Sequence, residues 1–152
     1  FEHKLLYRTI YQDVPTAYYT IPFGKAALLN KGISLSIITY GAGVHWALEI
    51  VNKHHISADI IDLRTLQPLD TTTIYTSVKK TGKALILQED TLFGGIASDI
   101  SALISENCFK YLDAPIKRVG SIETPIPFAN NLENNYLPKN RLHSEIIELL
   151  NY

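Results

Sequence analysis

Two adjacent carboxylates, Glu89 and Asp90, follow a short apolar run and precede Gly94-Gly95. In an open α/β sheet, ligands bind beyond the carboxyl ends of the parallel strands, so acidic side chains there are candidates for chemistry. Paired carboxylates can perform acid–base catalysis when their environments move their pKa values apart. These two are neighbours in the chain, however, and the sequence shows no base that would orient them. We therefore favour an interface or a structural loop for Glu89.

A second candidate site is the run Gly41-Ala42-Gly43-Val44-His45-Trp46, which follows another apolar run and begins a helical pattern. With Asp62 about twenty residues further on, it partly matches a dinucleotide-binding fingerprint. Trp46 stands where that fingerprint needs a small residue, which favours a simple strand-to-helix turn. The free N–H groups of such a turn could still hold an anion or a carboxylate. His45 is either a possible interface residue or a structural, solvated histidine.

The other reactive side chains do not form a catalytic set. Arg64 follows a further apolar run, where it could contact a carboxylate or phosphate, or form an ion pair that fixes the loop. The five histidines include no His-x-x-x-His pair with a glutamate, which excludes a zincin-type metal site. The single cysteine, Cys108, excludes an intrachain disulfide and lies on an apolar helical stripe, as a buried cysteine does. We therefore expect no catalytic, cofactor-binding or metal-binding residues in this chain.

Short apolar runs alternate with amphipathic segments in most of the chain. The predicted strands cover residues 33–39, 58–62, 84–88 and 116–119, and the helical patterns cover 44–51, 70–82, 96–108 and 142–150. Asp70 is placed to cap the second helix and Gly82 to end it. This alternation predicts an α/β, three-layer α/β/α fold with a mainly parallel sheet in residues 33–152. Residues 1–32 are expected to be an irregular lead-in segment from a preceding domain.

The composition limits the possible functions. A chain of 152 residues, 46% hydrophobic and 19% charged, is typical of one folded domain. Its net charge of −1 argues against a general nucleic-acid binder, which should be basic. No apolar run approaches the roughly 18 residues needed to span a membrane. The first residues are not a signal peptide, and the missing initial Met suggests a fragment of a longer protein.

Ordered motifs run through essentially the whole chain, at residues 1–8, 19–26, 40–45, 61–70, 78–82, 94–100, 111–119, 124–128 and 136–138. In this order they resemble the C-terminal domain of transketolase-like, thiamine-diphosphate-dependent proteins. The resemblance is closer to the beta subunit of the first, decarboxylating component of 2-oxoacid dehydrogenase complexes. Residues 106–109 and the ending Asn151-Tyr152 are most similar to the branched-chain (2-oxoisovalerate) enzymes, with pyruvate dehydrogenase beta subunits as the alternative.

The resemblance implies a transketolase C-terminal-like fold and an activity for the whole enzyme. That enzyme would decarboxylate a 2-oxo acid on thiamine diphosphate with magnesium and transfer the acyl group to a lipoyl arm. The Gly-Asp-Gly motif that holds the cofactor in this family does not occur in this chain, and the activating glutamate belongs to the preceding domain. The fragment alone is therefore expected to bind no cofactor and to be inactive. The implied location is the cytoplasm of a bacterium or the mitochondrial matrix of a eukaryote.

The resemblance also implies partners: the alpha subunit or alpha region, a second beta subunit, and the subunit-binding domain of the acyltransferase component. In relatives, that domain's basic residues meet the Asp of a Leu-Asp-Ala-Pro motif and the C-terminal carboxylate. These correspond to Asp113 and, where it is the natural end, Tyr152. From the residues alone, Asp113 is equally well explained as a turn residue before Pro115. A stand-alone docking module with no enzyme around it remains the alternative. Possible interface residues elsewhere are His45, Arg64 and Glu89.

Overall fold

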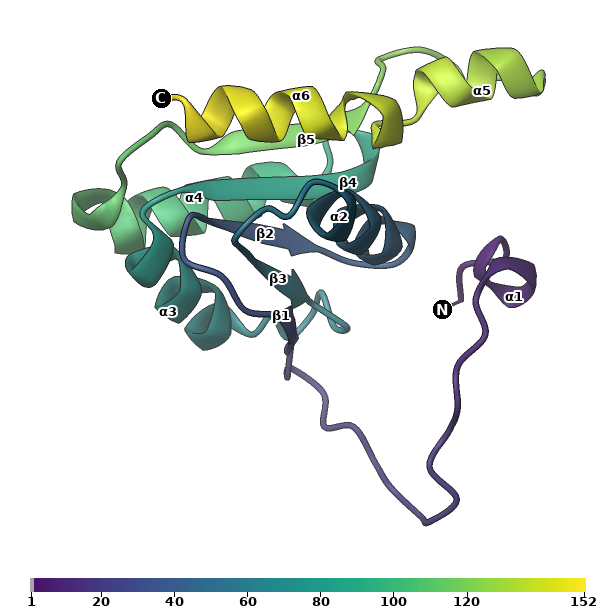
Figure 1. Cartoon of the computed structure of the whole chain (residues 1–152), viewed down its shortest axis with the longest axis horizontal. Helices are drawn as coiled ribbons and strands as arrows, with labels where there is room; N and C mark the ends of the chain where they lie inside the picture. Colours follow the sequence, from purple (N-terminus) through teal and green to yellow (C-terminus); the bar gives the residue numbers. More distant parts are fainter. Residues whose placement is uncertain (1) are drawn as a thin grey trace.

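A five-stranded sheet forms the centre of the structure, a computed structural model that describes residues 2–152 (Figure 1). Its strands lie in the order β1-β3-β2-β4-β5. Neighbouring strands are parallel from β3 to β5, and only β1 is antiparallel to its neighbour, β3. The strands are β1 (Ala27–Asn30), β2 (Leu35–Thr39), β3 (Ala58–Asp62), β4 (Ala84–Thr91) and β5 (Lys117–Ser121).

Helices cover both faces of this sheet, which confirms the predicted three-layer α/β/α fold. On one face lie α2 (Ala42–Lys53) and α6 (Lys139–Leu150), and on the other lie α3 (Thr71–Thr81) and α4 (Ile96–Cys108). Three short helices complete the structure: α1 (Leu6–Thr9), the 3-10 helix η1 (Phe109–Tyr111) and α5 (Asn130–Tyr136). Within residues 2–152, no helix is both long enough and apolar enough to cross a membrane.

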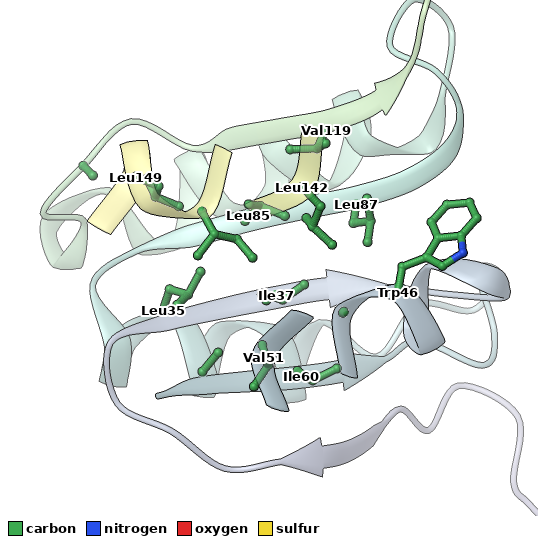
Figure 2. Close-up of a cluster of buried hydrophobic side chains, with 14 of the residues drawn as sticks. Leu35, Ile37, Trp46, Val51, Ile60, Leu85, Leu87, Val119, Leu142 and Leu149 are labelled. Carbon is green, nitrogen blue, oxygen red and sulfur yellow. The ribbon is translucent and has the colours of Figure 1, made fainter. Parts of the chain in front are cut away.

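The two faces of the sheet carry separate hydrophobic cores, because successive residues of a strand point to opposite sides. Ile37 contributes to the core under α2 and α6, which Figure 2 shows, whereas Ile38 contributes to the core under α3 and α4. Both are fully buried, and all five residues of β2 are buried, as expected of a parallel strand covered on two sides. Trp46, 7% exposed, packs into the first core, which favours the strand-to-helix turn over a dinucleotide site.

The boundaries of the elements differ from the sequence prediction in a few places. β2 begins at Leu35 rather than at residue 33, and β5 begins at Lys117 rather than at residue 116. The prediction that residues 1–32 are irregular is wrong for α1 and for β1. β1 gave no clear signal because its side chains are only partly buried, and pairing with β3 is what makes it a strand.

The segment between α1 and β1 leaves the body of the molecule as an extended arm (Figure 1). We call residues 10–23 the arm; Phe1 lies outside the described residues. His3 Nε2 lies 2.6 Å from Glu89 Oε2 and holds the chain before the arm. The N–H of Ala26 donates to Asp70 Oδ2 at 3.0 Å and holds the chain after it. The arm is therefore fixed at both ends and free between them.

Chymotrypsin is expected to cut the isolated chain first within the arm. Tyr11 and Tyr18 are 89% and 95% exposed, and among the described residues 11–23 have no hydrogen bond to the body. Proteases cut segments that open at little cost in free energy, and an unbonded extended segment is such a site. Mass spectrometry at short digestion times should show a product that begins in the arm. The exposed Phe128 is the internal control, and first cleavage there would contradict the expectation.

Candidate docking and interface sites

Asp113 and Tyr152 line the same surface hollow, although they are far apart in the sequence. The hollow has a volume of about 530 Å³ and lies at the edge of the sheet where the parallel strands begin. Asp113 reaches this edge in the turn before β5, and Tyr152 reaches it because α6 runs against the strand direction. Lys83 Nζ donates to the carbonyl oxygen of Leu150 at 2.8 Å and so fixes the end of α6 there. We call this the docking hollow.

The docking hollow combines acidic and apolar groups. Asp113 is exposed and Tyr152 is 75% exposed, so both are accessible to a partner. Phe109, on η1, is 77% exposed and also lines the hollow. Large apolar side chains with this exposure at a hollow are typical of interaction surfaces. The arrangement suits a protein partner that presents a basic group beside an apolar one.

The turn around Asp113 also has a structural role, so the two explanations of this residue are compatible. The backbone N–H of Asp113 donates to the carbonyl oxygen of Gly82 at 2.8 Å. Lys79 Nζ and Lys110 Nζ lie 5.4 and 5.1 Å from the ring centroid of Tyr111, in cation–π range. The hydrogen bond to Gly82 and the contact from Lys79 join the turn to the end of α3, whereas the contact from Lys110 lies within η1.

The other predicted residues lie at the opposite edge, where the parallel strands end. Glu89, on β4, contacts His3, and His3 lines a hollow of about 620 Å³ together with Tyr40 and Arg64. Burial first, and then the charges of Asp90 and Glu89, raise the pKa of Tyr40, so its hydroxyl stays protonated. The structure thus brings Glu89 and Arg64 to one region through His3.

Arg64 and His45 are placed differently within this edge. The Arg64 Nε lies 3.9 Å from Asp62 Oδ2, and the Arg64 N–H donates to Asp62 Oδ1 at 3.1 Å. This geometry favours the interpretation of Arg64 as an ion pair that fixes its loop. His45 is half-buried in the first turn of α2. Neither residue lies near the docking hollow, so the candidate residues form two groups at opposite edges.

Comparison with known sequences decides the family. Residues 24–141 match the family described as "Transketolase, C-terminal domain". The chain belongs to the transketolase C-terminal domain family. The resemblance inferred from the motifs is thereby confirmed for the family and its fold.

This transketolase C-terminal domain is 45% identical over 141 residues to the 2-oxoisovalerate dehydrogenase subunit beta of Bacillus subtilis, covering 90% of this chain and 43% of that protein. It is 43% identical over 150 residues to the pyruvate dehydrogenase E1 component subunit beta of the same species, covering 97% and 45%. The chain spans less than half the length of these curated relatives.

A solved structure supports the same fold. The protein described as "Split gene transketolase, inactive beta4 tetramer" superposes with a TM-score of 0.74 at 22% identity, over 92% of this chain and 46% of that one. At this identity the similarity concerns the fold alone.

Within residues 2–152, no group of three or more His, Cys, Asp or Glu side chains is arranged to hold a metal ion.

Two residues of these sites, His3 and Phe109, were not predicted from the sequence. His3 gave no signal because its partner, Glu89, is 86 residues away. Phe109 lies in the motif region similar to branched-chain enzymes, but only its exposure in the folded domain distinguishes it from a core residue. An exposed aromatic residue cannot be recognised before the neighbouring elements are placed.

Proposed function

We propose that this chain is the C-terminal domain of the beta subunit of a 2-oxoacid dehydrogenase first component, and that the whole enzyme acts on 2-oxoisovalerate. The observation that carries the proposal is the 45% identity to a 2-oxoisovalerate dehydrogenase subunit beta over 90% of this chain. The whole enzyme would decarboxylate its substrate on thiamine diphosphate with magnesium and pass the acyl group to a lipoyl arm. The cofactor sites belong to other domains, and this domain alone is inactive. The enzyme resides in the bacterial cytoplasm or the mitochondrial matrix.

The domain's own role is assembly and docking. Asp113, Phe109 and Tyr152 line one accessible hollow, which supports docking of the acyltransferase's subunit-binding domain at that edge. Carboxylates at an interface attract a basic partner and fix its orientation. At the opposite edge, the region around Glu89 and Arg64 is assigned to contacts with the alpha subunit or a second beta subunit.

Pyruvate is the second candidate substrate. It is favoured by the 43% identity to the pyruvate dehydrogenase E1 component subunit beta, which covers 97% of this chain. The difference between 45% and 43% is small, and the substrate contacts are assigned to other domains. The third candidate is not an enzyme subunit: a stand-alone docking module with no catalytic domain around it.

Turnover by the full-length parent protein with its partner subunit distinguishes these candidates. The assay contains thiamine diphosphate, magnesium and an artificial electron acceptor, with 2-oxoisovalerate and pyruvate measured in parallel. We expect kcat/KM for 2-oxoisovalerate to exceed that for pyruvate by about tenfold or more, because a pocket shaped for a branched chain loses contacts with a methyl group. A preference for pyruvate would instead assign the protein to the pyruvate dehydrogenases. Turnover of neither acid would support the docking module.

A further inference from the structure

The residue that ends α3, Gly82, has two separate reasons to be glycine. Its φ of +69° lies in the left-handed region, where residues with a side chain are strained. This is the reason that the sequence gives, since glycine commonly follows the last turn of a helix. The second reason is visible only in the folded domain and concerns Asp113.

The carboxylate of Asp113 occupies the space that a side chain of Gly82 would fill. A Cβ on Gly82 would overlap Asp113 Oδ2, lie 2.9 Å from Asp113 Cγ and lie 3.4 Å from the carbonyl oxygen of Tyr111. The N–H of Asp113 also donates to the Gly82 carbonyl oxygen at 2.8 Å. Backbone and side chain of Asp113 are therefore both placed against this one glycine.

The same carboxylate remains free for a partner. Asp113 is exposed, and within residues 2–152 it forms no ion pair. A charged group that is held in place before binding loses less conformational entropy when the partner arrives. The Asp113 carboxylate lies against the Cα of Gly82, and a Cβ at this position would displace it.

We propose that Gly82 is a positioning residue for docking. Because Gly82 has no side chain, the Asp113 carboxylate can lie against its Cα, at the docking hollow. In this position the carboxylate faces a basic side chain of the partner. This inference rests on the docking role proposed above. Gly82 itself does not touch the partner. It acts by leaving the space in which the Asp113 carboxylate lies, and so through the direction of that carboxylate.

Calorimetric titration tests the inference with the full-length beta subunit assembled with its alpha subunit. The probe is the purified subunit-binding domain of the acyltransferase component. The matched variants are Gly82→Ala and Gly94→Ala, because Gly94 has a similar φ of +73° but no atom within 4 Å of an added Cβ. Both variants strain the backbone, and only Gly82→Ala displaces Asp113. We expect Kd to rise about tenfold for Gly82→Ala and less than about twofold for Gly94→Ala.

A double-mutant cycle with Asp113→Ala separates positioning from a general structural effect. Once the carboxylate is removed, Gly82→Ala should weaken binding no further. Equal weakening by Gly82→Ala in both backgrounds, or equal effects of Gly82→Ala and Gly94→Ala, would overturn the positioning role and leave docking intact. If the wild type does not bind, or Asp113→Ala binds like the wild type, the docking role itself fails, and the positioning role with it.

Folding of the variants is controlled by their thermal midpoints. If Gly82→Ala does not fold, the pair Gly82→Asn and Gly94→Asn replaces the alanine pair. Asparagine tolerates the left-handed region better than alanine but carries the same Cβ. The expected Kd values and the outcomes that overturn the inference are unchanged.

Discussion

Asp113→Ala in the full-length beta subunit is expected to raise the Kd for the acyltransferase's subunit-binding domain about thirtyfold, which corresponds to about 2 kcal/mol. The carboxylate lines a hollow that a partner would cover, and the backbone N–H of Asp113 donates to the carbonyl oxygen of Gly82. Removing it leaves the partner's basic group without a counter-charge in a partly desolvated site. Calorimetric titration at low and physiological salt measures the change.

The matched control for this variant is Glu133→Ala. It removes one exposed acidic side chain from α5, at the other end of the molecule from the docking hollow. The Glu133→Ala and Asp113→Ala variants have the same net charge, so the long-range attraction between the protein and a basic partner changes equally in both. Only Asp113→Ala should lose most of its affinity. Similar losses in the two variants would mean that net charge alone governs docking.

Asp59→Ala is expected to lower the free energy of unfolding of the isolated chain by about 3 kcal/mol. The Asp59 side chain is 1% exposed and accepts hydrogen bonds from Lys80 Nζ at 2.6 Å, Ser77 Oγ at 2.6 Å and the Gly32 N–H at 3.0 Å. It thus connects β3 to α3 and to the loop before β2. The variant leaves Ser77 and the Gly32 N–H without this acceptor. Lys80, 44% exposed, can turn to water, which keeps the loss below that of a fully buried pair.

Urea denaturation measures this loss, with Asp62→Ala as the control on the same strand. Asp62 is 23% exposed, and its carboxylate has polar contacts with Arg64 alone among residues 2–152, through a 3.1 Å hydrogen bond from the Arg64 backbone N–H and a loose 3.9 Å contact with Arg64 Nε. Its replacement should therefore cost no more than about 1 kcal/mol. Equal losses for the two variants would contradict a special role of the Asp59 network.

The pH dependence of the same measurement provides a second check on Asp59. Burial opposes its ionisation, but the hydrogen bonds from Lys80, Ser77 and Gly32, together with the Lys80 charge, outweigh burial and lower its pKa. A carboxyl group with a lowered folded pKa stabilises the fold above its unfolded pKa, and this stabilisation is lost as the pH falls through the folded value. Wild type should therefore lose stability below about pH 4 more steeply than Asp59→Asn.

The candidate binding residues form two separate sites at opposite ends of the parallel strands. The docking hollow contains Asp113, Phe109 and Tyr152 at the edge where the strands begin. The His3–Glu89 contact and Arg64 lie at the opposite edge, where the arm also starts. The two sites proposed above lie at opposite ends of the strands, so binding at one would not block the other.

Local patterns in the sequence determined the order of the main strands and helices along the chain, and both ends of α3. Asp70 caps α3 by accepting the Thr73 N–H at 3.1 Å, and Gly82 ends the same helix with a left-handed φ, as predicted. These features were predictable because a cap acts within one helical turn and a buried strand shows its apolar run directly. The family was identified separately, through the resemblance of ordered motifs such as residues 111–119 to known proteins.

Only the tertiary structure decided which distant residues meet. The sequence treated β1 as irregular, because four partly exposed residues become a strand only when β3 offers them hydrogen bonds. It gave no sign that Gly82 seats Asp113 or that His3 contacts Glu89. Such contacts depend on the strand order and on how helices pack over it, and these are set by burial of the whole core rather than by neighbours in the chain.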